Sequence, residues 1–258
     1  MTKRHITRKR VLVSLLIILL ALASVAAGVI LLDQQAAAPP AVSKSPKITP
    51  KTTEQSSTTA TTFDKSRYST TDPSSLWVVV NKQHPFSPVT YTPSDLVTAY
   101  GHQVSGRLVI DLTAMIDDGA HDGAFITLVS SYRSYSYQVG LYTSYVASDG
   151  QAKADTYSAR AGYSEHQSGL AIDFGNKAGT CSVQDCYADT AEGKWLEANA
   201  YKYGFLLRYT AAKQSVTGYQ AEAWHYRYIG RDLSTEMHSK GISTLEEFFG
   251  ITGGETYN

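Results

Sequence analysis

The chain has no excess of either charge and contains very little cysteine. Its 23 lysines and arginines balance its 23 aspartates and glutamates, so nothing points to nucleic acid as a partner. No Ser-x-x-Lys motif occurs in it, which disfavours a serine acyl-enzyme mechanism. No internal repeat is visible, and this disfavours a repeat architecture. We expect a monomeric protein whose chemistry depends neither on cysteine nor on a serine nucleophile.

The first 32 residues predict a segment that enters a membrane. Residues 1–10 are basic and carry no acid. Residues 11–32 are uncharged and mostly aliphatic, and as a helix they would span roughly 33 Å, about the thickness of a bilayer core. The basic residues predict a cytoplasmic N-terminus. We therefore expect a single-pass anchor in the cell membrane with an extracellular C-terminal domain. The alternative is a cleaved signal peptide and a secreted protein.

The next stretch, residues 33–75, has almost no large apolar residue before Phe63. It is rich in Thr, Ser, Pro, Ala and Lys, a composition that cannot bury a core and predicts a disordered linker. Residues 76–250 remain, which is enough for one domain with a real core. An anchor followed by a spacer suits an enzyme that works outside the membrane.

The only two cysteines, Cys181 and Cys186, lie close together in the sequence. Outside the membrane, a disulfide that closes this short loop is a reasonable expectation. A metal site is less favoured, because no other cysteine or histidine lies nearby in the sequence, and free thiols are the remaining alternative. We interpret a bridge here as a local staple and assign it no chemistry.

Two short segments, each built around one histidine, carry side chains suited to zinc. His166, Asp173 and His225 supply two imidazoles and one carboxylate. That is a three-ligand set for Zn²⁺, which leaves a fourth position for water. Glu222, a carboxylate outside this set, can then take the proton from that water. Together these residues are the parts of a hydrolytic zinc site.

The spacing of these residues also has a physical interpretation. The apolar run Leu170–Phe174 predicts a buried strand, and Asp173 inside it must be paired or bind a metal. His166 precedes a glycine turn that could bring it back over Asp173. Strand alternation places His225 on one face of a later strand. Glu222 lies outside that strand and could therefore stand beside the metal without ligating it.

These segments resemble the VanY-type zinc D-alanyl-D-alanine carboxypeptidases. Their peptidase family also contains L,D-carboxypeptidases and D-Ala-D-Ala dipeptidases. The signature Ser-x-His-x6-Asp is present at residues 164–173, and Glu-x-Trp-His at residues 222–225. A third signature resembles residues 131–138, and the similarity extends from about Leu76 to Phe249. One departure is Ala223, where many relatives have proline, which alters backbone stiffness and no ligand.

The resemblance implies a role for each site residue. It assigns one zinc ion to the three ligands and makes Glu222 the general base, which also protonates the leaving amine. Arg133 becomes the clamp for a substrate carboxylate or a developing oxyanion, against the alternative of a surface salt bridge. Gln138 and Ser164 are implied to bind the terminal residue of the substrate, against the alternatives of a helix-surface amide and a turn serine. Structural or rim positions are expected for Glu165, Gln167 and Ser168, and cleft or core positions for Tyr132, Trp224 and Tyr228.

The expected fold class is α+β. Hydrophobic patterns predict strands at residues 125–130, 170–174, 205–208 and 224–229. They predict helices around residues 108–116, 135–148, 152–161, 190–203, 232–238 and 245–249, and a turn into a short helix at residues 91–96. Asp189 and Glu192 are spaced as a capping box for the fourth of the longer helices. The resemblance implies a small antiparallel sheet carrying a central zinc site, flanked by helices.

The first hypothesis for function is a zinc carboxypeptidase that removes the terminal D-alanine from peptidoglycan stem peptides in a bacterium with a single membrane. An L,D-carboxypeptidase or a peptidoglycan endopeptidase would use the same zinc site. The sequence does not separate these activities, because the deciding pocket walls are expected in the loops at residues 176–189 and 210–220. A non-catalytic wall-binding module is the alternative from another class, and the presence of Glu222 argues against it.

Overall fold

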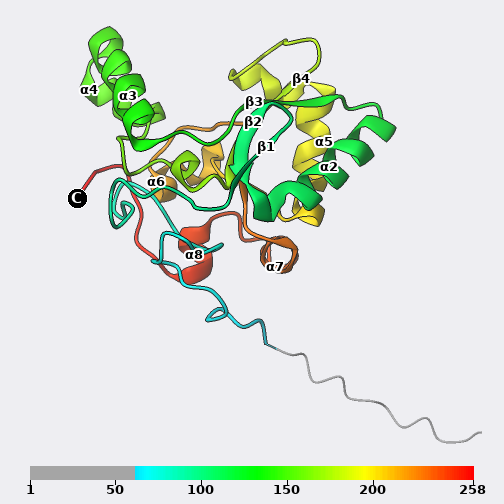
Figure 1. Cartoon of the computed structure of the whole chain (residues 1–258), viewed down its shortest axis with the longest axis horizontal. Coiled ribbons are helices and arrows are strands. Elements are labelled where there is room, and N and C mark those ends of the chain that lie inside the picture. The colour runs from blue at the N-terminus through cyan, green and yellow to red at the C-terminus, as the bar shows by residue number, and fades with distance from the viewer. Residues whose placement is uncertain (1–61) are drawn as a thin grey trace, which may run out of the picture. The chain divides into compact units, whose positions relative to one another are not determined.

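The computed structural model describes residues 62–258. The predicted basic segment, the predicted membrane helix and most of the predicted linker lie outside the described residues. Within residues 62–258, no helix is both long enough and apolar enough to span a bilayer. The described part begins as a loop that leads into a mixed α and β domain (Figure 1).

The main sheet has four antiparallel strands in the order β3-β4-β6-β5. Its strands are β3 (Ile126–Ser130), β4 (Ala171–Asn176), β5 (Phe205–Leu207) and β6 (His225–Tyr228). All four were predicted from the sequence. Because β4 and β6 are the two inner strands, side chains on them are held most firmly. The pairing of these two strands sets Asp173 directly opposite His225.

A second, two-stranded sheet replaces an expected short helix. β1 (Leu96–Ala99) and β2 (His102–Ser105) form a hairpin, so the predicted turn into a helix at residues 91–96 is wrong. The two residues between the strands, Tyr100 and Gly101, both have positive φ, at 50° and 79°. Positive φ at both central residues is what a type I′ hairpin turn requires. The turn lacks the Asn-Gly or Asp-Gly pair that usually marks such a hairpin, so it could not be recognised from the sequence.

The described part of the chain contains seven α-helices. They are α2 (Val109–His121), α3 (Tyr135–Asp149), α4 (Gln151–Tyr157), α5 (Ala191–Asn199), α6 (Gln214–Thr217), α7 (Arg231–Ser239) and α8 (Leu245–Phe249). The predicted helices are therefore confirmed, with shifted ends. The helix expected over residues 190–203 stops at Asn199 and continues as a 3-10 turn. Its cap is Thr190, whose Oγ1 accepts a hydrogen bond from the Gly193 amide at 3.0 Å, so the capping box at Asp189 is wrong.

Strand alternation divides the sheet between a hydrophobic core and a functional face. Ile172 and Phe174 on β4 are fully buried in one cluster with Leu112 of α2, Leu196 of α5 and Tyr226 of β6. The core cluster therefore lies between the sheet and the α2–α5 pair, which lie side by side (Figure 1). Since successive strand residues point to opposite faces, the residues between these core positions point away from the cluster.

The domain extends beyond both limits expected from the sequence, residues 76 and 250. Phe63 stacks on Trp77 with ring centroids 5.6 Å apart, and it meets Phe248 edge-on at 5.7 Å. At the other end, the backbone amide of Asn258 donates to the Lys82 carbonyl at 3.3 Å. Residues 62–75 therefore belong to the packed domain, because one aromatic residue in a polar stretch finds partners far along the chain.

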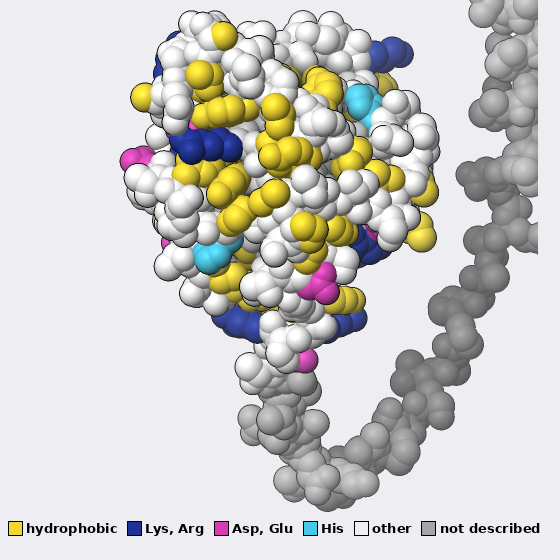
Figure 2. Space-filling model, turned by 60° about the vertical axis from the view of Figure 1, so that its left-hand side comes forward, with side chains coloured by type: hydrophobic (Ala, Val, Ile, Leu, Met, Phe, Trp, Pro, Cys, Tyr) yellow, Lys and Arg dark blue, Asp and Glu magenta, His cyan; other side chains and the backbone are white. Residues whose placement is uncertain are grey.

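The surface shows no dominance of one charge in the view of Figure 2. Hydrophobic side chains are spread over that face, with basic and acidic side chains mainly at its margins. Exposed single hydrophobic residues are normal on a soluble domain and need no partner.

Candidate metal centre

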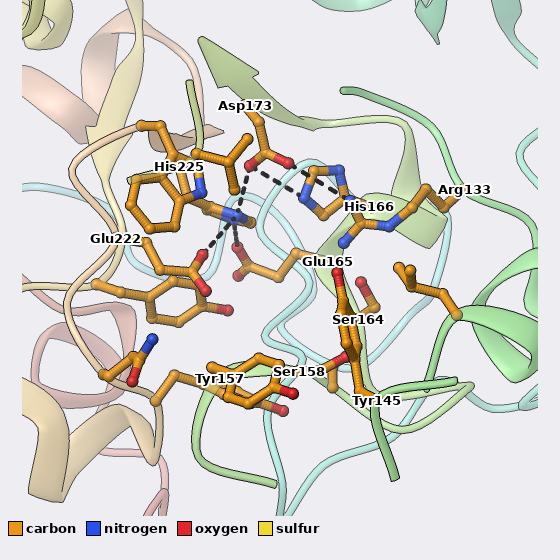
Figure 3. A pocket seen from close by; sticks show the side chains of 17 residues that line it. Arg133, Tyr145, Tyr157, Ser158, Ser164, Glu165, His166, Asp173, Glu222 and His225 are labelled. Atoms are coloured by element: carbon orange, nitrogen blue, oxygen red, sulfur yellow. Dashed lines mark hydrogen bonds and ion pairs between the residues drawn. The ribbon is translucent and has the colours of Figure 1, made fainter. Parts of the chain in front are cut away.

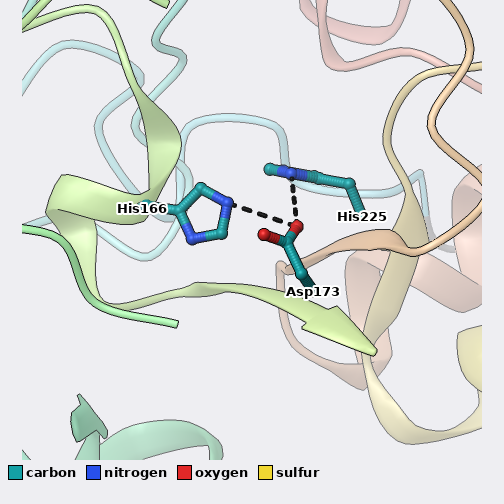
Figure 4. Close-up of side chains that lie close together, drawn as sticks. All are labelled: His166, Asp173 and His225. Carbon is teal, nitrogen blue, oxygen red and sulfur yellow. Dashed lines mark ion pairs between the residues drawn. The ribbon is translucent and has the colours of Figure 1, made fainter. Parts of the chain in front are cut away.

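The three predicted zinc ligands come together on the face of the sheet opposite the core. His166 Nε2 lies 3.3 Å from Asp173 Oδ1, and His225 Nδ1 lies 3.2 Å from the same oxygen. One ligand atom from each residue falls within 4.8 Å of the others, and all three side chains are buried. Figure 4 shows both rings directed at the Asp173 carboxylate. Their convergence, predicted from two separate motifs, is confirmed.

Local structure explains how a histidine seven residues upstream reaches the strand. His166 lies in a 3-10 turn, Glu165–Ser168, that ends at Gly169 in the left-handed conformation with φ of 69°. A Cβ atom at Gly169 would approach Leu96 Cδ2 to 2.9 Å and the Ser105 amide nitrogen to 3.1 Å. Only glycine fits this reversal easily, and the reversal sets His166 over Asp173.

Hydrogen bonds on the outer sides of both rings fix which nitrogen faces the centre. His166 Nδ1 lies 2.6 Å from the Ser131 carbonyl oxygen, which can only accept, so Nδ1 carries the proton. His225 Nε2 lies 3.4 Å from the Glu165 carboxylate, which likewise assigns the proton to Nε2. The nitrogens that face Asp173 are therefore the ones that a metal ion can bind. This is the arrangement in which metal-ligating histidines are usually found.

The chemistry of this donor set fits a zinc ion. Asp173 Oδ1 is buried and accepts no hydrogen bond from any described residue, a costly state for a carboxylate oxygen unless a cation meets it. Burial lowers the pKa of His166 to about 4, which keeps the ring neutral as a ligand must be. Burial alone would raise the pKa of Asp173, but the facing His166 ring holds it well below its usual range. Burial alone would lower the pKa of His225, but Asp173 and Glu165 raise it to about 9, so zinc must displace a proton from this ring. Once that proton has left, two neutral imidazoles and one carboxylate are the ligands of an open catalytic zinc site.

Glu222 stands beside the ligands, outside β6, as expected. Its Oε2 lies 3.4 Å from His225 Nδ1, and it is not one of the three grouped ligands (Figure 3). Its backbone amide donates to the Tyr209 carbonyl at 3.0 Å, which fixes the segment. Burial raises the pKa of Glu222 to about 7, above its ordinary value of 4.5. A carboxyl group with that pKa can accept and release a proton near neutral pH.

Arg133 reaches the centre from the loop after β3. Its NH1 group donates to Asp173 Oδ2 at 3.4 Å and to Ser130 Oγ at 2.9 Å. Its Nε group donates to Gln138 Oε1 at 3.0 Å. The Arg133 side chain is 19% exposed, so it remains open to the pocket while three groups hold it in place. It can therefore present its remaining donors to a substrate oxygen without reorganising.

The structure gives Gln138 a different position from the one expected. Its Oε1 accepts from Arg133, its Nε2 donates to the Ala159 carbonyl at 2.7 Å, and the side chain is 1% exposed. It does not line the pocket, so the predicted direct contact with substrate is replaced by support of Arg133. Ser164 does line the pocket, as predicted.

The pocket around the centre is closed by elements far apart in the sequence. Tyr145 of α3 and Tyr157 of α4 pack edge-on at 5.1 Å and lie at the end of the pocket away from Asp173 (Figure 3). The two loops predicted to form the walls do so, through Val183 of the first loop and Tyr219 and Gln220 of the second. Of the three aromatic residues left between cleft and core, Trp224 lines the pocket and Tyr132 and Tyr228 do not.

One buried carboxylate at the site was not singled out from the sequence. Glu165 is fully buried, so a rim position for it is wrong. Its Oε1 accepts from Arg208 Nε at 2.8 Å and from Arg227 NH1 at 3.1 Å, while its Oε2 faces His225. The two arginines lower the pKa of Glu165 against the effect of burial. The only signal in the sequence was a glutamate beside a ligand and two arginines near predicted strands.

A chain of buried ion pairs continues from Glu165 to the C-terminal helix. Arg208 forms a bidentate pair with Glu246 of α8, at 2.9 Å and 2.7 Å. Asn81 Nδ2 donates to the same carboxylate at 2.9 Å. The zinc ligand His225 is thus connected to α8 through two carboxylates and one guanidinium. The cost of burying these charges is offset because each one is paired.

The expected disulfide between Cys181 and Cys186 forms in the loop after β4, apart from these ion pairs, and confirms the predicted local staple.

The site and fold define a zinc metallopeptidase. The pattern that describes the VanY family, D-alanyl-D-alanine carboxypeptidase, matches residues 101–231. The chain is 35% identical over 188 residues to the putative carboxypeptidase YodJ of Bacillus subtilis, a match that spans 69% of this chain and 68% of YodJ. This chain therefore belongs to the VanY family, and its cofactor is zinc.

Two solved structures resemble the domain closely enough to support the same conclusion. The LdcB LD-carboxypeptidase is 34% identical with a TM-score of 0.64, over 70% of this chain and 88% of LdcB. A vancomycin-resistance VanY enzyme in complex with Zn(II) is 29% identical with a TM-score of 0.59, over 69% of this chain and 99% of that enzyme. Both similarities cover the α+β domain that carries the three ligands.

Proposed function

We propose that this enzyme is a D-alanyl-D-alanine carboxypeptidase that removes the terminal D-alanine from peptidoglycan stem peptides. The observation that carries the proposal is the position of Glu222. This carboxylate, 12% exposed and with its pKa raised to about 7, stands 3.4 Å from a ligand of a three-ligand zinc centre. Membership of the VanY family supports the substrate class. A wall-binding module without activity has no use for such a group.

The chain's own residues account for the proton transfers. The zinc ion supplies a Lewis acid that polarises the scissile carbonyl and makes a water molecule acidic. Glu222 takes the proton from the attacking water as its carboxylate and delivers it to the departing amino group of D-alanine. Only 12% of its side chain is exposed, which limits the competition of bulk water for that proton.

Arg133 and Ser164 bind and orient the peptide. The guanidinium of Arg133, held by Ser130 and Gln138, offers donors to the oxyanion that develops at the attacked carbonyl. Ser164 lines the same pocket and offers a hydroxyl group to the terminal residue. A pocket closed around a substrate with a free carboxylate would favour cleavage at the chain end.

The second candidate function is L,D-carboxypeptidase activity on tetrapeptide stems. The similarity to LdcB favours it, because that enzyme is described as an LD-carboxypeptidase. The same zinc, Glu222 and Arg133 would serve, since neither the attack on the carbonyl nor the proton transfer depends on the configuration of the preceding residue. The two activities differ in how the pocket walls receive that residue.

A mass-spectrometric assay separates the two activities. Purified protein is incubated with a pentapeptide stem and with a tetrapeptide stem, each with and without a zinc chelator. Loss of one alanine from the pentapeptide alone, abolished by the chelator, is the expected result. Cleavage of the tetrapeptide alone would transfer the assignment to the second candidate.

We propose further that residues 11–32 anchor the enzyme in the cell membrane, with the catalytic domain outside and acting as a monomer. The basic residues before an uncharged aliphatic run support this orientation. Cell fractionation tests it: the full chain should remain with the membrane after a high-salt wash. Its recovery in the culture medium, shortened at the N-terminus, would identify a cleaved signal peptide instead.

A further inference from the structure

The loop after β4 brings one apolar side chain to the mouth of the pocket. Val183 lines the pocket together with Glu222, Trp224 and His225, yet it is 45% exposed. None of the motifs that identify the family includes this residue. An apolar group left half-exposed beside a catalytic centre is available for contact with a bound substrate.

The backbone at Val183 adopts a conformation that a β-branched residue rarely takes. Its φ is 52°, and φ at Cys181 is 55°. For a valine this is a strained conformation, which persists only where the surrounding structure imposes it. Such residues cluster at functional sites, so the cause of the constraint is informative.

Three attachments impose this conformation, and two of them lie on the strand that carries Asp173. Asn176, the last residue of β4, accepts from the Thr180 amide at 3.0 Å. Tyr187 donates its hydroxyl to the Gly175 carbonyl at 3.2 Å. Between these points the disulfide joins Cys181 to Cys186 and encloses Val183. The loop is thus a rigid extension of β4, and it holds Val183 at a fixed position relative to the zinc ligands.

We propose that Val183 is a specificity-determining residue, held by the Cys181–Cys186 loop as an apolar contact for an alanine methyl group of the stem peptide. This inference rests on the proposed function. A rigid apolar wall favours a substrate with a small apolar side chain at that point, and it takes no part in the proton transfers. Its contribution is therefore made equally to the bound substrate and to the transition state, which affects KM and leaves kcat unchanged.

Substitution of Val183 tests the contact separately from its structural role. Val183→Ala should raise KM for the cleaved stem peptide about threefold to tenfold, with kcat within about twofold and full zinc content. Val183→Gly should raise KM as well without lowering the melting temperature, because glycine adopts positive φ freely. The matched control is Val139→Ala on α3, since Val139 is 42% exposed and does not line the pocket. Unchanged KM in both Val183 variants would overturn the proposal.

The loop and the methyl group are tested by two further comparisons. The double variant with Cys181→Ser and Cys186→Ser should raise KM by a similar factor, since it releases the loop. The second comparison uses two pentapeptides, each with glycine in place of one of the last two D-alanines. One of these peptides lacks the methyl group that Val183 contacts, and for that peptide Val183→Ala should no longer raise KM. Persistence with both glycine peptides would refute contact with alanine.

The proposed function fails separately if the wild-type protein cleaves no pentapeptide. If it cleaves only the tetrapeptide, the KM comparison is made on that substrate, where an unchanged KM would still overturn the role of Val183. If it cleaves neither, the dissociation constants of both peptides are compared between the wild type and Val183→Ala. Equal dissociation constants would then contradict the contact.

Discussion

Glu165 holds the outer nitrogen of the zinc ligand His225. Its Oε2 lies 3.4 Å from His225 Nε2, while the opposite nitrogen of the ring lies 3.2 Å from Asp173. Arg208 and Arg227 bind the other oxygen of Glu165 and keep the carboxylate charged in the interior. This pair sets the orientation of the ring and directs its Nδ1 at the metal centre.

Glu165→Gln should therefore weaken zinc binding by about 10-fold to 100-fold. The variant keeps a polar group beside His225 but loses the negative charge, which also leaves Arg208 and Arg227 less well compensated. A competition titration with a chromogenic chelator measures the affinity, at a temperature where circular dichroism shows the variant folded. The control is Glu247→Gln on α8, which removes a partly exposed carboxylate paired with Lys213. An unchanged zinc affinity in the Glu165 variant would refute its role at the centre.

Arg133→Lys should lower kcat by about 100-fold to 1,000-fold with zinc retained, because lysine cannot replace a guanidinium held by three hydrogen bonds. Gln138→Ala should produce a smaller loss of kcat in the same direction, since it releases one side of Arg133. Steady-state kinetics with the cleaved stem peptide measure both effects. Arg231→Lys, at a half-exposed arginine paired with Asp111, serves as the control. If Gln138→Ala raised only KM, Gln138 would be a direct substrate ligand after all.

The raised pKa of Glu222 predicts a pH-dependent stability in the metal-free protein. Its pKa of about 7 in the folded state exceeds its ordinary value of 4.5. The contribution to folding is therefore complete below pH 4.5 and is lost as the pH rises through 7. Glu222→Gln does not titrate. As the pH rises from 4.5 to above 7, the stability of the metal-free variant relative to the metal-free wild type should therefore increase by about 3 kcal/mol. Urea unfolding at pH 4.5 and pH 8 measures this change. A constant difference between the two proteins would show that Glu222 keeps an ordinary pKa.

The ligands could be predicted from the sequence because burial and residue type coincide there. Asp173 inside an apolar strand required a partner, and His166 and His225 were available to supply one. The support behind them could not be predicted, because Arg208, just after β5, and Arg227, on β6, reach Glu165 from separate segments of the chain. Gln138 was expected in the pocket because of the family resemblance. Its buried position could not be predicted, because its second partner, the Ala159 carbonyl, comes from a different part of the chain.

The same distinction applies to the fold. The strands of the main sheet and the six helices expected after residue 107 all form. The β1–β2 hairpin was missed, since its turn uses Tyr100 where asparagine is typical. The limit of the domain was placed too late because Phe63 is a single aromatic residue whose partners, Trp77 and Phe248, are apparent only after folding.

The most direct test of the account measures zinc content and turnover in Glu222→Ala, side by side with the wild type. The residue stands beside the ligands without belonging to them, so the variant should bind one zinc ion with wild-type affinity. Its turnover of the cleaved stem peptide should fall by at least about 100-fold, the usual contribution of a general base. Full turnover in a zinc-loaded Glu222→Ala protein would contradict the mechanism, and loss of zinc would make Glu222 a ligand.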